Sequence, residues 1–254
     1  MNGDIVRSTP IPLPPLPVQT EIVRILDKFV EQQEQLEKLI ELRTKQYEYY
    51  REEMLTAKEG WETKKISDFT NVFTASRVHK EEWKTFGVPF YRSSDVVSHF
   101  NGVENNHGKV FISVELYEKL SAKSGKFHKD DILVTGGGTI GIPYLVPNDD
   151  PFYVKDADLL CIQKNETVHH MFLYYFFLTK KFRDYLNKIT HNATIAHYTI
   201  NQIKDTIVDF PSYEEQKQIV SKILLFDNSL KELKSALELS KKRYEHYRDE
   251  MLKF

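Results

Sequence analysis

The sequence PPLPVQTEIVRILDKFVEQQEQLEKLIELRTKQYEYYREEML, residues 14–55, recurs near the end of the chain as PSYEEQKQIVSKILLFDNSLKELKSALELSKKRYEHYRDEML, residues 211–252. The two copies align without a gap at an offset of 197 residues, and 16 of the 42 positions are identical. Repetition at a fixed offset indicates a duplicated structural unit. The alternative, two unrelated amphipathic helices on one core, explains the pattern less well, because such helices rarely share their sequence.

Each copy predicts one long helix with an apolar seam. Apolar residues alternate at spacings of four and three over more than four heptads, which is typical of a coiled coil. Pro17 suits the first turn of a helix, and Ser212 with Glu215 matches a capping box. The predicted seam comprises Ile22, Leu26, Phe29, Leu36, Ile40 and Tyr47 in the first helix, and Ile219, Ile223, Phe226, Leu233, Leu237 and Tyr244 in the second.

The order of the segments predicts how the two helices pair. The first helix enters the intervening region at its C-terminal end, and the second leaves that region at its N-terminal end. We therefore predict an α+β fold, in which one mixed α/β domain is flanked by two long helices that form an antiparallel coiled coil. If the two seams pair end to end, Gln33 lies opposite Ser240 and the polar layer helps to fix the register. The alternative places both residues at a wet edge of the seam.

The chain divides into four predicted segments. Residues 1–17 are a Pro-rich stub of a missing domain, 18–57 the first long helix, 58–210 a globular domain and 211–254 the second long helix. The Pro-rich run could bind an SH3-type domain, but an extended connector is the simpler interpretation. Within the globular domain we predict strands at 88–92, 131–135, 142–146 and 159–162, and one buried helix at 171–186.

Composition excludes several classes of protein. Of the 254 residues, 41% are hydrophobic and 28% charged, which is typical of a soluble globular chain. The net charge of −2 does not indicate a general nucleic-acid binder, so any phosphate-binding surface must be local. A single cysteine, Cys161, excludes an internal disulfide and a cysteine-based zinc site, and favours the cytoplasm. We expect no signal peptide and no membrane association, because the apolar runs are far shorter than the ~20 residues of a membrane span.

Motifs for catalysis are weak. Residues 136–141 match G-x-G-x-x-G after a predicted strand, but Pro143 follows in an apolar run where a dinucleotide site requires a helix. A tight turn is the simpler interpretation, and close approach of bare backbone to a large ligand is a third. Asp156, Asp158 and Lys164 are too loosely spaced to indicate a nuclease. We therefore predict a non-catalytic binding module without a metal or cofactor.

Polar residues in the predicted loops supply the chemistry of recognition. Arg, Lys, Asn, Ser and Thr are the side chains that contact phosphates and base edges. Taken singly, each is more often a solvated surface residue. The candidates for DNA binding are Arg77, Lys80, Arg92, Ser93, Ser94, Thr135, Gly136, Gly137, Thr139, Asn192, Thr194, His197 and Tyr198.

Several motifs together resemble the specificity subunits of type I restriction–modification enzymes. No single motif is specific, but their order together with the duplicated helix is. They are the Pro-rich lead and Gln-x-x-Ile-Val at the start of each helix, Trp61 with Lys65-Ile66-Ser67-Asp68-Phe69, Phe90-Tyr91-Arg92-Ser93-Ser94-Asp95, Asp131-Ile132-Leu133-Val134 with its Gly-rich turn, and Tyr244-x-x-Tyr247-Arg248-x-x-Met251-Leu252.

The resemblance implies a target recognition domain that reads a short sequence in the major groove of double-stranded DNA. The helices would act as a spacer and as docking rods for methyltransferase subunits, and a restriction subunit is a further candidate partner. Those partners would methylate and cleave the DNA and bind S-adenosylmethionine and ATP. By position, the resemblance implies contacts from Arg92, Ser93, Ser94, the turn 135–139 and the loop 192–198. Arg77 and Lys80 are added for their charge.

The sequence departs from the resemblance in one respect. A complete specificity subunit has two recognition domains, one at each end of the spacer, whereas this sequence has one domain and a stub. Two such chains could associate as a homodimer and read a palindromic two-part site. The main alternative function is a coiled-coil adaptor that binds protein partners only, and a nuclease or methyltransferase acting alone is the third. DNA binding that weakens with salt would argue against the adaptor.

Overall fold

The computed structural model describes residues 13–103, 109–190 and 196–253, so residues 1–12 of the predicted stub lie outside the described part. The chain divides into two compact units. One, the helix pair, combines Met1–Tyr49 with Ile223–Phe254, and the other, the globular unit, is Tyr50–Lys222. The predicted fold class, a mixed α/β domain flanked by two long helices, is confirmed.

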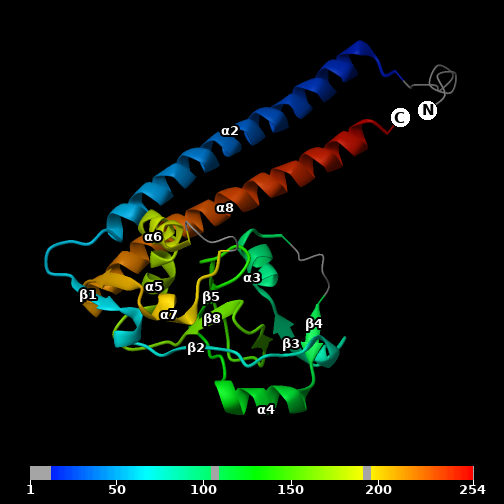
Figure 1. The fold of residues 1–254 in the computed structure, drawn as a ribbon. Coiled ribbons are helices and arrows are strands. Elements are labelled where there is room, and N and C mark those ends of the chain that lie inside the picture. The colour runs from blue at the N-terminus through cyan, green and yellow to red at the C-terminus, as the bar shows by residue number, and fades with distance from the viewer. Residues whose placement is uncertain (1–12, 104–108, 191–195, 254) are drawn as a thin grey trace. The chain divides into compact units, whose positions relative to one another are not determined.

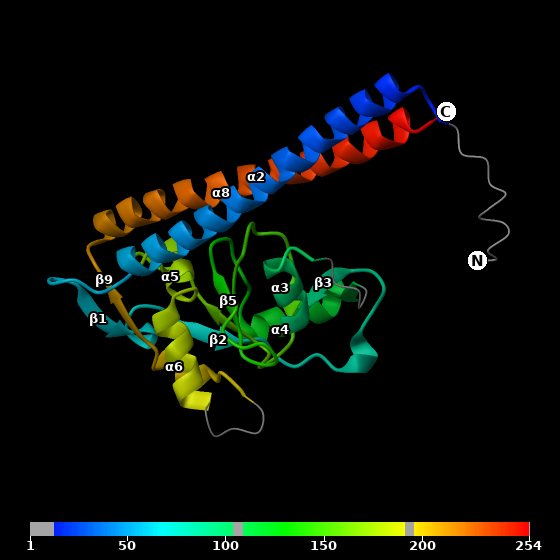
Figure 2. The same ribbon diagram turned by 90° about the horizontal axis from the view of Figure 1, so that it is seen from above.

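Helices α2 (Leu16–Met54) and α8 (Tyr213–Met251) are each 39 residues long and run antiparallel, side by side (Figures 1 and 2). The Phe29 and Tyr247 rings stack with their centroids 5.5 Å apart. The Lys241 ammonium lies 3.3 Å from the Glu37 carboxylate. All the predicted seam residues are partly or fully buried, and the residues between them are mostly exposed. Burial of this stripe is the main favourable term for pairing such helices.

The register of the helix pair differs from the predicted one. Because Phe29 faces Tyr247, the layer of Gln33 is opposite residues 243–244, and Ser240 is opposite Leu36. The prediction that Gln33 pairs with Ser240 is therefore wrong. Among the described residues, neither the Gln33 amide nitrogen nor the Ser240 hydroxyl has a hydrogen-bond partner. Hydrogen bonds inside the globular unit fix the end of α2 and the start of α8, and this explains the register. Their effect on the register is larger than that of one polar layer in the seam.

The described residues of the globular unit form three small sheets. The largest is antiparallel, in the order β2 (Val72–Thr74), β8 (Leu159–Ile162), β5 (Ile132–Thr135), β6 (Pro143–Leu145). In the second, β3 (Val88–Tyr91) lies between β4 (Val110–Ile112), which is antiparallel to it, and β7 (Tyr153–Val154), which is parallel. In the third, β1 (Glu62–Lys65) pairs with β9 (Ile207–Phe210).

Buried strands and short helices complete the unit. Every residue of β5 and β8 is buried, which explains their continuous apolar sequence and confirms those two predicted strands. The remaining elements are η1 (Ile66–Asp68), η2 (Lys80–Glu82), α3 (Ser93–Phe100), α4 (Val114–Ser124), α5 (His170–Phe176), α6 (Lys180–Thr190) and α7 (Ile200–Lys204).

The predicted helix at 171–186 is two helices, α5 and α6. Thr179 separates them, because its hydroxyl donates to the Phe176 carbonyl at 2.7 Å and accepts the Phe182 N–H at 3.2 Å. A threonine that bonds the backbone on both sides ends one helix and caps the next. His169 caps the start of α5, where its Nδ1 accepts the Met171 N–H.

The Gly-rich segment forms the tight turn between β5 and β6. Gly138 and Gly141 have φ near +70°, in the left-handed region that favours glycine. Gly136 has a different constraint, because a Cβ there would lie 2.7 Å from the backbone oxygens of both Ala157 and Tyr198. The turn leads into strand β6 and not into a helix, so it lacks the geometry of a dinucleotide site.

Replacing Leu36 and Leu237 together by Asp should separate the helix pair. Both side chains lie in the seam, where unpaired charge is costly, so we expect the free energy of unfolding to fall by at least about 3 kcal/mol. Circular dichroism at 222 nm during thermal unfolding measures this effect. The matched control is Leu42→Asp with Leu239→Asp on the same helices, where both leucines are at least half exposed. Equal effects in the two variants would contradict the seam.

Replacing Gly136 by Ala should destabilise the globular unit by about 1–3 kcal/mol, because the added methyl meets two backbone oxygens that have no room to move. Gly137→Ala is the control, since its nearest atom is the Asp158 side-chain oxygen at 3.2 Å, which can rotate away. Denaturant unfolding should rank the two variants in that order, and the reverse order would refute the close approach at Gly136.

Candidate nucleic-acid interface

Four segments that are distant in sequence meet at one edge of the globular unit, and we call them the loop cluster. They are the turn 136–141, the first turn of α3, residues 155–158 and residues 196–198. Gly136 donates its N–H to the Asp158 carbonyl at 2.8 Å and accepts the Tyr198 N–H at 2.9 Å. The Lys155 N–H bonds the Tyr91 carbonyl at 2.9 Å. The cluster is thus held by backbone bonds at the ends of β3, β5 and β7.

The loop cluster exposes some of the predicted contact residues. Ser94, Thr139 and His197 are exposed, and Ser93 is half-buried. Their hydroxyl and imidazole groups can donate or accept hydrogen bonds, as base edges require. This edge brings together residues that are distant in sequence, such as Ser94 and His197, which agrees with a composite recognition surface.

Thr135, Gly136, Gly137 and Tyr198, four of the predicted contact residues, are buried and line the inside of the turn. The Thr135 hydroxyl donates to the Thr139 carbonyl and accepts the Ile142 N–H, so it shapes the turn. The Tyr198 hydroxyl bonds Thr206, and burial raises the pKa of Tyr198 far above its usual value. These residues position the turn from inside. The sequence did not indicate this burial, because residue type alone does not distinguish a threonine or tyrosine in a loop from one in a core.

Arg92 was predicted as the end of the strand 88–92, and it directly precedes α3 as its N-cap residue. Its guanidinium makes two bonds of 3.1 Å to the Asp95 carboxylate, and its backbone N–H donates to the same carboxylate at 2.6 Å. Both side chains are more than four-fifths buried. A bidentate pair of this kind fixes the first helical turn. In this structure Arg92 therefore positions Ser93 and Ser94.

Sequence reasoning missed two further cations, Lys155 in the loop cluster and Arg183 of α6 beside it. Lys155 lies 2.8 Å from the Asp158 carboxylate. Arg183 of α6 donates to the Ile140 carbonyl at 3.1 Å, and burial lowers its pKa. Ala157, in the same loop, has φ +55°, which is uncommon for a residue other than glycine. Nothing in the sequence marks these residues, because their roles arise from contacts between distant segments.

Two other predicted contacts, Arg77 and Lys80, are exposed and follow strand β2. The Thr74 hydroxyl, three residues before Arg77, accepts the Ala157 N–H of the loop cluster at 3.1 Å. The Ser76 N–H bonds the Tyr153 hydroxyl, which also bonds Ser124 at the end of α4. Asn192 and Thr194 lie outside the described residues.

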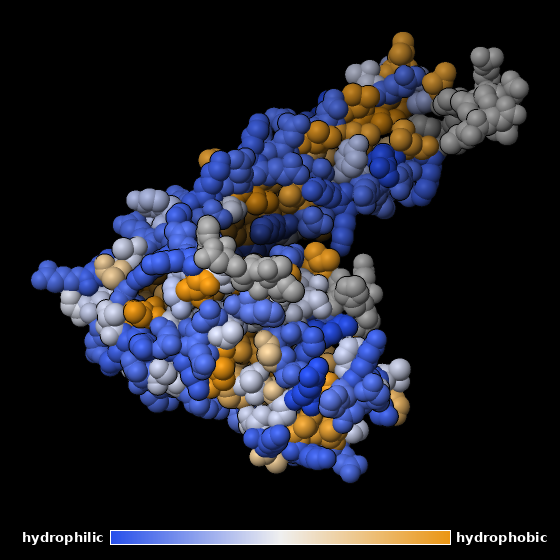
Figure 3. All heavy atoms as spheres, in the orientation of Figure 1, coloured by the Kyte–Doolittle hydropathy of each residue, from blue (hydrophilic) through white to orange (hydrophobic). Residues whose placement is uncertain are grey.

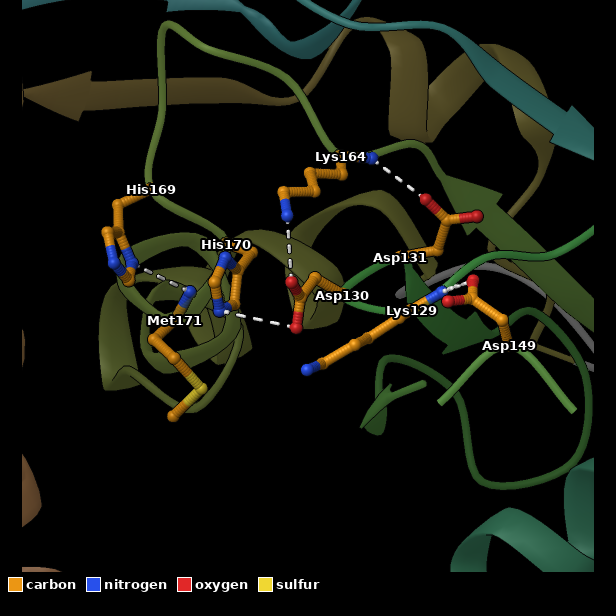
Figure 4. A network of polar contacts seen from close by, with 8 residues as sticks. All are labelled: Lys129, Asp130, Asp131, Asp149, Lys164, His169, His170 and Met171. Carbon is orange, nitrogen blue, oxygen red and sulfur yellow. Dashed lines mark hydrogen bonds and ion pairs between the residues drawn. The ribbon is translucent and has the colours of Figure 1, made fainter. Parts of the chain in front are cut away.

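A second polar cluster lies at the start of α5 (Figure 4). The Asp130 carboxylate is 2.9 Å from the Lys164 ammonium and 3.6 Å from His170 Nε2. Burial acts to raise the pKa of Asp130, but the Lys164 hydrogen bond and the nearby cations outweigh it and lower the pKa. Burial lowers the pKa of His169 and His170, which favours their neutral forms. The cluster joins the turn before β5 to α5 and has the character of a structural network.

Neither cluster has the composition of a metal centre. Within residues 13–103, 109–190 and 196–253, no group of three or more His, Cys, Asp or Glu side chains is placed to hold a metal ion. Across the same described residues, no helix combines the length and the apolar character needed to cross a membrane.

Sequence comparison gives a consistent result. The family model described as "Type I restriction modification DNA specificity domain" matches residues 1–44 and 58–239. A Haemophilus influenzae protein assigned to the type I restriction enzyme specificity subunits is 33% identical over 263 residues, which cover 98% of this chain and 65% of that protein. A type I restriction enzyme specificity subunit of Escherichia coli is 26% identical, with 98% of this chain and 63% of that protein covered.

The fold agrees with the sequence comparison. The crystal structure of the HsdS subunit from Thermoanaerobacter tengcongensis superposes with a TM-score of 0.59 at 16% identity, covering 95% of this chain and 60% of that one. The chain thus spans somewhat less than two thirds of the length of these relatives. The extent of the family match over both the globular unit and the long helices decides the assignment, and the chain belongs to the type I restriction modification DNA specificity domain family.

Proposed function

We propose that the chain recognises a short sequence in double-stranded DNA and directs partner methyltransferase subunits to it, without catalysing a reaction itself. The observation that carries the proposal is the family match, which covers the globular unit together with most of both long helices. The relatives are named as specificity subunits, and their sequences align with 98% of this chain. The proposed location is the cytoplasm, where such DNA is found.

The loop cluster is the proposed surface for reading bases. Its described cations Arg92, Lys155 and Arg183 are each bonded to a carboxylate or a carbonyl, so they are not arranged as an array for phosphates. Its exposed groups, Ser94, Thr139 and His197, are hydrogen-bonding side chains suited to base edges. Arg77 and Lys80 would then serve as phosphate contacts that orient the duplex.

The helix pair is the proposed docking surface for the methyltransferase subunits. Leu42 and Leu239 occupy equivalent positions in the two sequence copies, and they are 64% and 50% exposed. Equivalent apolar sites on two helices suit two copies of one partner. A restriction subunit would join the complex through the methyltransferase. Association of two copies of this chain as a homodimer is the other arrangement that these surfaces would support.

Methylome sequencing of cells that express the chain with a cognate methyltransferase subunit tests the proposal. A new methylated motif is the expected result, and a palindromic two-part motif would indicate a homodimer. If the two proteins co-purify but no new motif forms, recognition of DNA is refuted and the protein-binding adaptor is favoured.

Replacing Thr139 by Val should lower the affinity for the recognised duplex by about 1–3 kcal/mol, because the hydroxyl that would bond a base edge is lost without a change of shape. Affinity for duplexes of unrelated sequence should be unchanged, since phosphate contacts remain. Fluorescence anisotropy with both duplexes measures the difference. Thr85→Val, at another exposed threonine, is the control and should have no effect. An equal loss on both duplexes would remove Thr139 from the base-reading surface.

A further inference from the structure

The loop cluster contains an accessible ion pair between Lys155 and Asp158. The Lys155 ammonium lies 2.8 Å from the Asp158 carboxylate, and the two side chains are 44% and 26% exposed. A second ion pair at this edge, between Arg92 and Asp95, is 17% and 16% exposed and fixes the first turn of α3. The pair of Lys155 and Asp158 thus presents a cation and a carboxylate side by side to solvent.

Backbone hydrogen bonds hold the segment that carries this ion pair. The Lys155 N–H donates to the last carbonyl of β3 at 2.9 Å, and the Asp158 carbonyl accepts the Gly136 N–H at 2.8 Å. Between them, the Ala157 N–H donates to the Thr74 hydroxyl at 3.1 Å. The two charged side chains therefore start from a fixed backbone, which lowers the entropy cost of contact with a ligand.

The ion pair is continuous with the exposed part of the loop cluster. A Cβ added at Gly137 would lie 3.2 Å from a carboxylate oxygen of Asp158, and one added at Gly138 would lie 3.9 Å from the Ser93 hydroxyl. Because these glycines have no side chain, a ligand can approach the turn and the carboxylate together. Figure 3 shows hydrophilic residues over most of the visible face of the globular unit, with apolar residues in small separate patches. A polar ligand suits such a surface better than an apolar one.

We propose that Lys155 and Asp158 together read one G·C base pair in the major groove, with guanine under Lys155 and cytosine under Asp158. Lysine to guanine and aspartate to cytosine are the contacts that the base edges favour for these two side chains. This assignment rests on the proposed function, recognition of double-stranded DNA, and adds the identity of one base pair and the two residues that select it.

The separation of the two charges matches that of the groups they would contact. In the major groove guanine O6 accepts and cytosine N4 donates, and an N–H···O bond of about 2.9 Å joins them within the base pair. The Lys155 and Asp158 atoms are 2.8 Å apart and offer a donor and an acceptor in the complementary order. Each side chain can therefore bond its own base while it stays close to the other.

A T·A pair in the same orientation fits less well, although it also places an acceptor under Lys155 and a donor under Asp158. Guanine offers the lysine a second acceptor, N7, whereas thymine places a methyl group beside its O4. Adenine N7 is an acceptor next to the amino group and repels the carboxylate, whereas cytosine has only a C–H there. The reversed pairs, C·G and A·T, would set donor against donor and acceptor against acceptor. The ion pair therefore selects G·C.

Phosphate binding is a poorer role for this ion pair. The Asp158 carboxylate would repel a phosphate that approaches the Lys155 ammonium, and release of the lysine toward a phosphate would break the pair. A base-pair edge that offers an acceptor and a donor side by side keeps both charges bonded.

The variant Asp158→Asn tests the assignment in the complex of the chain with its cognate methyltransferase subunit. Fluorescence anisotropy is measured on duplexes in which each base pair of the methylated motif is varied in turn. At one G·C pair of the motif, Asp158→Asn should change the preferred pair to T·A, because an asparagine amide bonds both N6 and N7 of adenine. At the same pair, Lys155→Met should reduce the preference for guanine about ten-fold or more. Glu118→Gln, in an exposed ion pair with Lys126, is the matched control and should leave every preference unchanged.

The outcomes separate the reading of G·C from DNA recognition itself. If the parent complex methylates a motif that lacks G·C, or whose preferences Asp158→Asn leaves unchanged, the assignment is overturned and DNA recognition stands. If Asp158→Asn and Lys155→Met weaken binding to all duplexes equally, the ion pair only shapes the loop, and the assignment is again overturned. A parent complex that methylates no motif would overturn both.

Discussion

One buried amide organises the start of helix α8. Gln216 has no exposed surface, and its two polar atoms bond the backbone at Pro211, Thr167 and His169. A buried amide with its partners missing is strongly unfavourable, so the strand β9, the start of α8 and the start of α5 must keep one arrangement. The polar cluster of Asp130, Lys164 and His170 extends that arrangement to the turn before β5. From there the backbone bonds of β5 reach the loop cluster.

The loop cluster contrasts with the usual electrostatics of a nucleic-acid surface. Its arginines and lysine are held by internal acceptors and mainly define the loops. This division suits a recognition surface, because cations that are already paired add little affinity for DNA of unrelated sequence. Discrimination between sequences then depends on hydrogen bonds to the donor and acceptor groups of the base edges, which differ from base to base. The net charge of −2 fits the same division.

Sequence reasoning predicted what depends on local periodicity. The long helices, their seam and the strands β5 and β8 follow from apolar spacing, which is fixed by residues close in the chain. The register of Gln33 and Ser240 did not follow, because the helix ends decide it. The burial of Thr135 and Tyr198 and the role of Arg183 depend on contacts between segments that are distant in sequence, such as Tyr198 with Gly136, and these carry no periodic signal. The break at Thr179 is local, but a threonine in an apolar run has several common roles.

The heptad repeat restricts the lengths that the helix pair can have. Seven residues of helix advance about 10 Å along the axis, and B-DNA advances about 3.4 Å for each base pair. Inserting one heptad into both helices would keep every seam residue in phase and would lengthen the pair by about three base pairs of DNA. If the seam is to stay continuous, the length of the pair can therefore change only in steps of about three base pairs.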